Sequence, residues 1–562
     1  MKRFRTLVDA LSSAPGDRPF VTYWADEDEQ ETVTFAEFRR RAHHHGHWLR
    51  AHGVGRGDRV VVIMPQGIAL MTMFAGAMIL GAVPAILAYP NFKFEPEKYR
   101  SGLLGVTRNL DAKAVVIDGA FPDELREHVA VGNTLLRANG VEAGVELALP
   151  ELANGENDLA FIQHSAGTTG LQKGVALTHR AVLTQIEHLA TQLQVQEEKD
   201  RVYSWLPLYH DMGLIACFML PLVCHIPVVL QSPIDWVMRP ESMLQAISEH
   251  KCSLAWLPNF AFQFTAHRVP AERRKDCDLS SMRALINCSE PVQASSMDEF
   301  EHSLRDHALK AAALQSSYAM AENVFAVTQS DLSQTGGPAR LWVDRGRFRS
   351  EHVAVPVREQ APGAVCFVSS GRLLPRHKLR IVSEQAAELG DGHVGEILVK
   401  SDCLFDGYFN RPDLTRDVLA DGWYRTGDLG FQWDGELFVV GRKKDLLIVG
   451  GENLYPQDIE EIVAGHPEIH DGRVVAGGFY NAESGTEDIV VVAEVEAEEA
   501  LMRSPQIEQE VRRRVVAGLG VSVRSIFLKA PKWIVKSTAG KAARSATLEK
   551  LVREHPELGQ GA

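Results

Sequence analysis

Strand-like and helix-like segments alternate along about the first 300 residues of this 562-residue chain. Apolar runs of strand length occupy 59–63, 159–162 and 284–287, whereas 35–52 and 178–194 repeat their apolar residues with the period of a helix. Parallel strands need a crossover between them, and that crossover is usually a helix. The alternation therefore predicts an α/β protein with largely parallel sheets.

The length of the chain and a change of pattern predict two domains. A chain of 562 residues is too long for one hydrophobic core. From about residue 335 the segments become β-rich and are interrupted by glycines, and a further boundary follows near 441–446. We expect a large N-terminal domain over 1–441, made of two sheet-helix subdomains and a distorted β-barrel. A small α+β C-terminal domain is expected over 442–562, after the boundary near 441–446.

Composition and charge argue against several classes of protein. The net charge of −14 disfavours nucleic acid as a partner, because binding a duplex requires a basic surface. The cysteines are scattered without a C-x-x-C pair, which is typical of reduced thiols and predicts a cytoplasmic protein. Residues 68–89 carry no charge, but Gly76, Gly81 and Pro84 interrupt them. We expect a helix followed by a buried strand there, and no transmembrane segment.

A histidine cluster, His43, His44, His45 and His47, lies in a charged amphipathic stretch. Adjacent residues on a helix do not face one another, and no carboxylate or cysteine accompanies the pair at positions 43 and 47. The pattern therefore predicts a solvated helix face instead of a metal site.

Residues 163–175 read QHSAGTTGLQKGV and have the chemistry of a phosphate loop. Glycines let backbone N–H groups approach an anion, threonine hydroxyls donate hydrogen bonds, and one lysine supplies charge. The expected order is a strand, this loop and then a helix. A Walker A motif does not fit, because Gln172 stands at its second glycine and Gly174 at its Ser/Thr.

Seven further motifs follow the loop in a fixed order. They are SWLPLYHDMGLI (204–215), PNFAF (258–262), NCSEPV (287–292), SYAMAEN (317–323), YRTGDLG (424–430), GRKKDLLIVGGENLYPQDIE (441–460) and KSTAGKAARS (536–545). Together they resemble the adenylate-forming superfamily of acyl-CoA synthetases, fatty-acyl-AMP ligases and nonribosomal adenylation domains. The resemblance covers nearly the whole chain and is strongest to the fatty-acyl-AMP ligase and acyl-CoA synthetase branch.

The resemblance implies a reaction in two steps. A hydrophobic, fatty-type carboxylic acid and ATP, with Mg²⁺, would give acyl-AMP and pyrophosphate. The thiol of CoA or of a carrier protein's phosphopantetheine would then displace AMP. Three alternatives stay open: a ligase that loads only a carrier protein, a thiol-transfer enzyme that uses acyl-AMP made elsewhere, and a silent nucleotide- or acyl-binding protein.

The resemblance also implies roles for residues at the reacting end of the nucleotide. Thr168, Thr169 and Lys173 would hold the β- and γ-phosphates. Glu322 would hold Mg²⁺, which prefers one or two carboxylates together with phosphate oxygens. Lys541 would bridge the substrate carboxylate and the α-phosphate, where negative charge gathers during the reaction.

The adenosine end has its own implied set. Tyr318 would stack on the adenine. Asp428 would accept hydrogen bonds from both ribose hydroxyls, and Arg442 would reinforce that contact. The edge of the adenine would be lined by the backbone of Ser289, Glu290 and Pro291.

Four more residues complete the expected site. His210 would lie at the mouth of an apolar acyl pocket. The resemblance implies that the C-terminal domain, 442–562, is a mobile lid with its hinge near 442–446. Lys444 falls at that hinge, and Gly450 and Gly451 would face the channel for the pantetheine arm.

Two departures from the superfamily pattern bear on the first step. Gln172 replaces the usual proline before the loop lysine, and Ala319 replaces a glycine after the stacking aromatic. Proline pre-sets the backbone, so its loss should loosen the loop. Residues 334–360 resemble a segment that, in fatty-acyl-AMP ligases, hinders the lid from reaching the pose that serves CoA.

Overall fold

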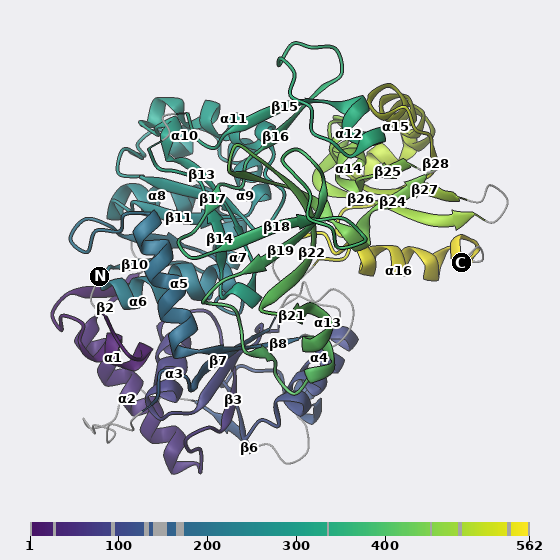
Figure 1. The fold of residues 1–562 in the computed structure, drawn as a ribbon. Helices are drawn as coiled ribbons and strands as arrows, with labels where there is room; N and C mark the ends of the chain where they lie inside the picture. Colours follow the sequence, from purple (N-terminus) through teal and green to yellow (C-terminus); the bar gives the residue numbers. More distant parts are fainter. Residues whose placement is uncertain are drawn as a thin grey trace.

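The computed structural model describes residues 3–25, 30–90, 96–128, 134–138, 154–164, 173–333, 336–449, 452–481, 486–536 and 541–559. A large N-terminal domain carries a smaller C-terminal domain on one side, coloured yellow-green in Figure 1. The predicted α/β class with two unequal domains is confirmed. Among the described residues, no helix is both long and apolar enough to cross a membrane.

The largest sheet of the N-terminal domain has nine strands, most of them parallel. Its order is β17 (Arg372–Leu373), β14 (Ala326–Gln329), β13 (Leu314–Ala319), β12 (Ala284–Cys288), β11 (Leu254–Leu257), β9 (Val202–Ser204), β10 (Val228–Leu230), β1 (Pro19–Trp24) and β2 (Gln30–Thr34). The run from β13 to β1 is parallel, and antiparallel strands close both edges. Strands buried on both faces need continuous apolar runs, as 284–287 has.

A second sheet and a three-stranded sheet lie beside the first. The second is parallel throughout, in the order β4 (Val83–Ile86), β3 (Arg59–Ile63), β5 (Ala114–Ile117) and β6 (Thr134–Arg137). The third is antiparallel: β20 (Gly407–Tyr408), β8 (Gly174–Thr178) and β7 (Leu159–His164).

Helices cover and connect these sheets. They are α1 (Leu7–Ser12), α2 (Phe35–Ala51), α3 (Ile68–Ile79), α4 (Pro96–Leu110), α5 (His179–Gln192), α6 (Leu220–Cys224), α7 (Pro233–Met238), α8 (Glu241–His250), α9 (Asn259–Arg268), α10 (Ala271–Arg274) and α11 (Ala294–Leu304), with a π-helical segment at Met212–Met219. The uncharged stretch 68–89 is therefore a buried helix, α3, followed by strand β4, as predicted.

Helices α2 and α3 cross closely, and this burial overturns one prediction. His44 and His45 are 6% and 1% exposed, so the expected solvated face is wrong for these two residues. The reason is that α3 covers this side of α2: a Cβ placed on Gly76 of α3 would lie 2.9 Å from the Cβ of His45. Burial lowers the pKa of His45 to about 4, which leaves its ring neutral inside the core.

The same crossing predicts a stability effect. In Gly76→Ala the new methyl group would lie 2.4 Å from the Ala42 carbonyl oxygen and 2.8 Å from the Gly46 nitrogen. Because backbone atoms cannot yield as a side chain can, we expect the free energy of unfolding to fall by about 1–3 kcal/mol. Gly102→Ala in α4 is the control, since no atom lies within 4 Å of its new Cβ. Equal denaturant midpoints for the two variants would contradict the close crossing.

The β-rich part expected as a distorted barrel consists of two sheets on a common core. One pairs β15 (Arg340–Asp344) with β16 (Ala364–Val368). The other contains β18 (Lys378–Val382), β19 (Gly395–Lys400), β22 (Trp423–Trp433), β21 (Leu419–Ala420) and β23 (Glu436–Arg442). Phe348 of α12 (Arg345–Glu351) and Phe431 of β22 lie in the core between the sheets. Helix α13 (Pro412–Val418) lies before β21.

The C-terminal domain has its own core. Strands β26 (Ile469–Asn481), β27 (Thr486–Val495) and β28 (Val523–Lys529) form one sheet, and β24 (Leu447–Val449) pairs with β25 (Glu452–Leu454). Helices α14 (Pro456–Ala464) and α15 (Ser504–Leu519) pack on the sheet through Ile459, Val463, Val511 and Val515. Helix α16 (Arg544–Glu554) runs along the other side, close to the chain end (Figure 1).

Candidate active site

A cavity of about 2520 Å³ lies between the two domains and is lined by both. The residues predicted from the sequence that line it are Lys173, His210, Ser289, Glu290, Pro291, Tyr318, Glu322, Asp428, Arg442, Lys444 and Lys541. The other four, Thr168, Thr169, Gly450 and Gly451, lie outside the described residues. The structure thus brings together, on one cavity, residues spread over more than 350 positions of sequence, from 173 to 541.

Asp428, Tyr318 and Arg442 form one group in this cavity. The Tyr318 hydroxyl donates a hydrogen bond of 2.6 Å to Oδ2 of Asp428, and Arg442 Nε lies 3.3 Å from Oδ1. Asp428 and Arg442 face each other because they are register partners on β22 and β23. Burial raises the pKa of the Asp428 carboxyl, and Arg442 and Tyr318 oppose that rise. The group offers two carboxylate oxygens, which suit a vicinal diol.

Glu322 and Lys173 meet through a residue that the sequence did not single out. The Tyr408 hydroxyl donates a hydrogen bond of 2.6 Å to Oε1 of Glu322, and Lys173 Nζ lies 4.7 Å from the centre of the Tyr408 ring. Tyr408 reaches this place because β20 pairs with β8, which begins one residue after Lys173. In such an arrangement the carboxylate can bind a metal ion while the ammonium group, on the other side of the phenol, binds a polyphosphate.

Lys541 comes from the C-terminal domain and reaches across the cavity. Its Nζ donates a hydrogen bond to the backbone carbonyl of Ser289 in the N-terminal domain. Ser289 has φ +70°, a left-handed conformation that costs a non-glycine residue energy and is found mostly where function requires it. The contact holds the C-terminal domain with its lysine over the cavity.

His210 is fixed by its neighbour Asp211, which the sequence analysis also missed. His210 Nδ1 lies 2.6 Å from Oδ1 of Asp211, whose oxygen also accepts the Met212 N–H at 2.8 Å. Burial favours a raised pKa for Asp211, but His210 and the Met212 N–H hold it below its ordinary value. Asp211 is therefore ionised and keeps the His210 ring oriented at the edge of the cavity.

An aromatic wall closes another part of the cavity. The rings of Trp205 and Trp236 stack with their centres 3.8 Å apart and an interplanar angle of 3°. Phe260 meets both indoles edge-on, and Phe264 is tilted against Trp236. Trp236, Phe260 and Phe264 line the cavity, so this part of it is apolar and suits a hydrophobic group.

The expected order of strand, loop and helix is wrong in one respect. Residues Gly174–Thr178 form β8, antiparallel to β7, and α5 begins only at His179. The short run VALT pairs with both β7 and β20 and adds a strand between the loop and α5, which forms close to the expected helix over 178–194. The loop therefore joins two antiparallel strands and does not open a helix.

Lys444 and its neighbours lie where the two domains join. Lys444 is exposed at the edge of the cavity, in a single turn after β23. The next residue, Asp445, pairs with Arg544 at 2.8 Å, and Arg544 also pairs with Glu460 of α14 at 2.9 Å. The turn after Lys444 is therefore tied to the C-terminal domain.

Fold and cavity together define a two-domain ligase that uses a nucleotide to activate its substrate. A family model described as "AMP-binding enzyme" matches residues 8–409. A 4-hydroxyphenylalkanoate adenylyltransferase of Mycobacterium marinum is 30% identical, over 97% of this chain and 91% of that protein. A long-chain-fatty-acid–AMP ligase of Mycolicibacterium smegmatis is 29% identical, over 87% and 84%.

A solved structure from a study of fatty acyl-adenylate ligases of E. coli and L. pneumophila has the same fold. It superposes with a TM-score of 0.90 at 27% sequence identity, and the match covers 99% of both chains. The chain belongs to the AMP-binding enzyme family, and the resemblance drawn from its motifs is confirmed. Its cofactors are ATP and Mg²⁺, as in that family.

Proposed function

We propose that this enzyme converts a hydrophobic carboxylic acid and ATP to acyl-AMP and pyrophosphate, and then transfers the acyl group to a thiol. The observation that carries the proposal is the contact of Lys541 with Ser289. It brings a cation of the lid to the cavity that holds Asp428, Glu322 and Lys173. The names of the relatives, a fatty-acid–AMP ligase and an adenylyltransferase, support the same chemistry.

The adenosine end would be held by the group around Asp428. The carboxylate would accept the ribose hydroxyls, exchanging its bond from Tyr318 for one from the sugar, and Arg442 would keep it ionised. The Tyr318 ring would stack on the adenine. The backbone of Ser289, Glu290 and Pro291 would line its edge.

The phosphate end would be held by Lys173 together with Thr168 and Thr169 of the phosphate loop. Glu322 fits a Mg²⁺ site, because its carboxylate lies on the cavity next to the lysine that meets the phosphates. When bound, the metal ion neutralises phosphate charge. Tyr408 fixes the Glu322 carboxylate and keeps Lys173 beside it.

The first chemical step would take place beneath Lys541. An oxygen of the substrate carboxylate forms a bond to the α-phosphorus, and the bond from that phosphorus to the bridging oxygen of pyrophosphate breaks. Both reactants are anions, so the enzyme must position and neutralise them. Lys541 would do so from the lid, and His210, oriented by Asp211, would meet the carboxylate at the mouth of the acyl pocket.

The acid would be hydrophobic, with its tail against the aromatic wall of Trp236, Phe260 and Phe264. Burying apolar surface there contributes roughly 25 cal/mol per Å² to binding. Two kinds of acid fit the relatives' names: a long-chain fatty acid and an aryl alkanoate.

The domain boundary and the compartment belong to the same proposal. We place the N-terminal domain at 1–441 and the lid at 442–562, with the hinge at 442–446. Two contacts on either side of the hinge support this boundary: Arg442 still contacts Asp428 of the N-terminal domain, whereas Leu447 packs in the C-terminal core. Lys444 would turn within this hinge, and Gly450 and Gly451 would face the pantetheine channel. A cytoplasmic location is supported by the seven cysteines, none of which forms a disulfide.

Carboxylate-dependent release of pyrophosphate tests the proposal. The assay would contain Mg-ATP and a panel of fatty and aryl alkanoic acids, without a thiol and then with CoA or a phosphopantetheinylated carrier protein. We expect release with hydrophobic acids and thioester once a thiol is added. Thioester from supplied acyl-AMP without any pyrophosphate release would instead identify a thiol-transfer enzyme. Nucleotide binding without either product would identify a silent binding protein.

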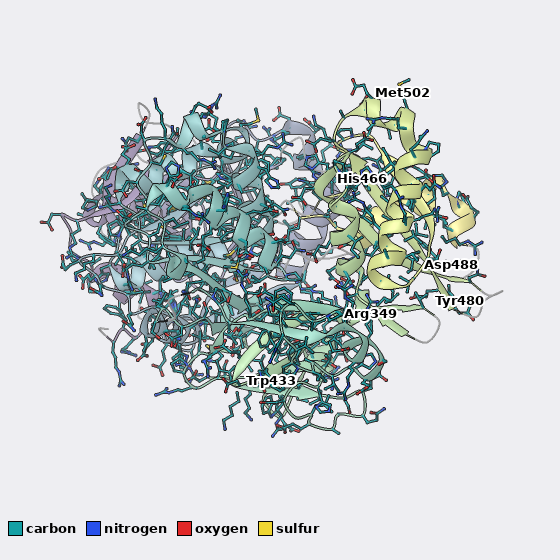
Figure 2. All side chains as sticks on the ribbon, turned by 90° about the horizontal axis from the view of Figure 1, so that it is seen from above. Arg349, Trp433, His466, Tyr480, Asp488 and Met502 are labelled. Atoms are coloured by element: carbon teal, nitrogen blue, oxygen red, sulfur yellow. The ribbon has the colours of Figure 1, made fainter. Side chains whose placement is uncertain are left out.

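A ligase that loads only a carrier protein is a second candidate, favoured by a contact between the domains. Arg345 of α12 donates to the Gly518 carbonyl, and Arg349 donates to the Leu519 carbonyl at 2.5 Å. These carbonyls end α15 of the lid, where cations are favourable. Figure 2 shows Arg349 at the border of the C-terminal domain. Helix α12 lies within 334–360, the segment singled out from the sequence, and it holds the lid in the pose that reaches Ser289.

Removing this contact should change the choice of acceptor. In Arg345→Ala/Arg349→Ala the lid loses two charged hydrogen bonds in its present pose, each typically about 1.5–3 kcal/mol. We expect the ratio of acyl-CoA formed to acyl-AMP formed to rise at least about tenfold, because the loss of even one such bond exceeds the roughly 1.4 kcal/mol that corresponds to a factor of ten. Arg347→Ala is the matched control, since Arg347 pairs with Glu351 on its own exposed helix face. An unchanged ratio in the double variant would contradict the role of α12.

A further inference from the structure

A buried cluster of metal-binding side chains lies outside the substrate cavity. His188, His377 and Cys403 each offer one ligand atom, and these atoms lie within 4.8 Å of one another. Their exposed fractions are 5%, 7% and 0%. The three residues come from separate elements: α5, the turn before β18 and the loop between β19 and β20. None of the chemistry proposed above uses them.

The separation of two of the donors fits a tetrahedral cation. Cys403 Sγ lies 3.5 Å from His377 Nε2. Zinc bonds of about 2.3 Å to sulfur and 2.0–2.1 Å to nitrogen, at tetrahedral angles, would place these atoms roughly 3.6 Å apart. The other ring nitrogen of His377 lies 2.9 Å from the Pro375 carbonyl. Such a backbone contact fixes the ring and leaves Nε2 as a ligand, the arrangement usual for metal-bound histidines.

His188 supplies an unsatisfied nitrogen to the cluster. Its Nδ1 is buried and has no hydrogen-bond partner among the described residues. The same nitrogen lies 3.8 Å from Oδ1 of Asp402, which is the residue before Cys403. A buried polar atom without a partner costs stability, so its presence needs an explanation. A cation between the donors would satisfy it and would bring Asp402 within reach as a fourth ligand.

The hydrogen bonds that a cation would displace are surplus. Asn323 Nδ2 lies 2.9 Å from His377 Nε2, 2.8 Å from the Ala326 carbonyl and 3.3 Å from Gln185 Oε1. An amide nitrogen has two hydrogens for these three acceptors. Giving up His377 therefore leaves Asn323 fully bonded. Its other atom, Oδ1, accepts the Ser401 hydroxyl at 2.6 Å and keeps the amide in this orientation.

We propose that His188, His377 and Cys403 bind a structural Zn²⁺ ion, with Asp402 or a water molecule in the fourth position. Thiolate and imidazole ligands favour Zn²⁺, whereas Mg²⁺ prefers oxygen ligands and belongs at Glu322. Binding releases the thiol proton of Cys403 to solvent, because the ligand is the thiolate. The site ties α5 to two loops of the β-rich part.

The test uses the full chain without a purification tag. The protein is stripped with a chelator and titrated with Co²⁺, a spectroscopic substitute for Zn²⁺, and then with Zn²⁺. We expect one equivalent of Co²⁺ to give the intense visible bands of a tetrahedral site and a thiolate-to-cobalt absorption, both removed by one equivalent of Zn²⁺. Elemental analysis of the unstripped protein should find about one zinc per chain.

Variants separate this site from other metal-binding groups. Cys403→Ser should lose the thiolate absorption, and His377→Gln should weaken Zn²⁺ binding at least tenfold. Two control variants should leave the thiolate absorption and the affinity for Zn²⁺ unchanged: Cys252→Ser, at another buried cysteine, and His47→Gln, in the histidine-rich helix. The absence of a thiolate band in the wild type would overturn the proposal even if a variant fails to fold. A band that persists in folded Cys403→Ser, or occupancy by copper alone, would also overturn it.

Discussion

Lys541→Ala is expected to slow carboxylate-dependent release of pyrophosphate by about 10²- to 10³-fold, the usual cost of removing one group that stabilises charge in a transition state. Lys541 reaches the cavity from the lid, where it donates a hydrogen bond to the Ser289 carbonyl. Binding of ATP should persist, because Asp428 and Lys173 of the N-terminal domain and Arg442 at the hinge are unchanged. The loss should therefore fall on kcat far more than on the KM for ATP.

The measurement compares Lys541→Ala with Lys532→Ala under saturating ATP and acid. Lys532 also lies on the C-terminal domain and lines the cavity, so it controls for a general loss of positive charge. We expect Lys532→Ala to retain activity within a few-fold of wild type. Similar losses in both variants, or a loss of ATP binding in Lys541→Ala, would show that the lysine does not act on the reacting groups.

Glu322→Gln is expected to reduce adenylation about 10²-fold at millimolar Mg²⁺, because a carboxylate ligand of the metal ion becomes a neutral amide. The amide oxygen can still accept the hydrogen bond from Tyr408, so the fold of the site should survive. Raising the Mg²⁺ concentration should restore part of the rate, since the remaining oxygen can still bind weakly. This dependence on the metal ion distinguishes a ligand from a residue that only supports the structure.

Tyr408→Phe is the matched control for that variant. It removes the hydroxyl that fixes Glu322 but keeps the carboxylate and the ring beneath Lys173. We expect about a tenfold loss, the lower end of the range of about 1.5–3 kcal/mol for one hydrogen bond to a charged group. Measuring the rate of adenylation against Mg²⁺ concentration for Glu322→Gln and Tyr408→Phe tests whether Glu322 binds the metal ion. A rate of Glu322→Gln that does not depend on Mg²⁺ would contradict the metal site.

The motifs of the sequence predicted the cavity well, because each combines residue types that the chemistry needs at a fixed spacing. Lys173, Tyr318 and Asp428 come from three separate motifs, and the fold brings them to one cavity. The alternation of apolar runs likewise predicted the parallel sheets, since burial on both faces leaves a continuous apolar pattern. Periodicity within single segments was sufficient to predict the sheets, whereas the resemblance carried by the motifs indicated the residues of the cavity.

What the sequence did not predict depends on pairing between distant segments. Tyr408 reaches Glu322 only because β20 pairs with β8, more than 200 residues earlier in the chain. The same pairing makes Gly174–Thr178 a strand between the loop and the predicted helix, and the sequence analysis did not predict this strand. His44 and His45 are buried because α3 crosses α2 at Gly76, a contact that no local pattern reports.

A single-turnover experiment tests the central claim most directly. Enzyme in excess is mixed with Mg-ATP and an isotopically labelled hydrophobic acid in the absence of any thiol, and the products are separated after denaturation. We predict one labelled acyl-AMP and one pyrophosphate for each acid consumed, with the adenylate retained by the native enzyme until a thiol is supplied. Cleavage of ATP without labelled adenylate, or no reaction with any acid of the panel, would contradict the assignment of this cavity to acyl-AMP formation.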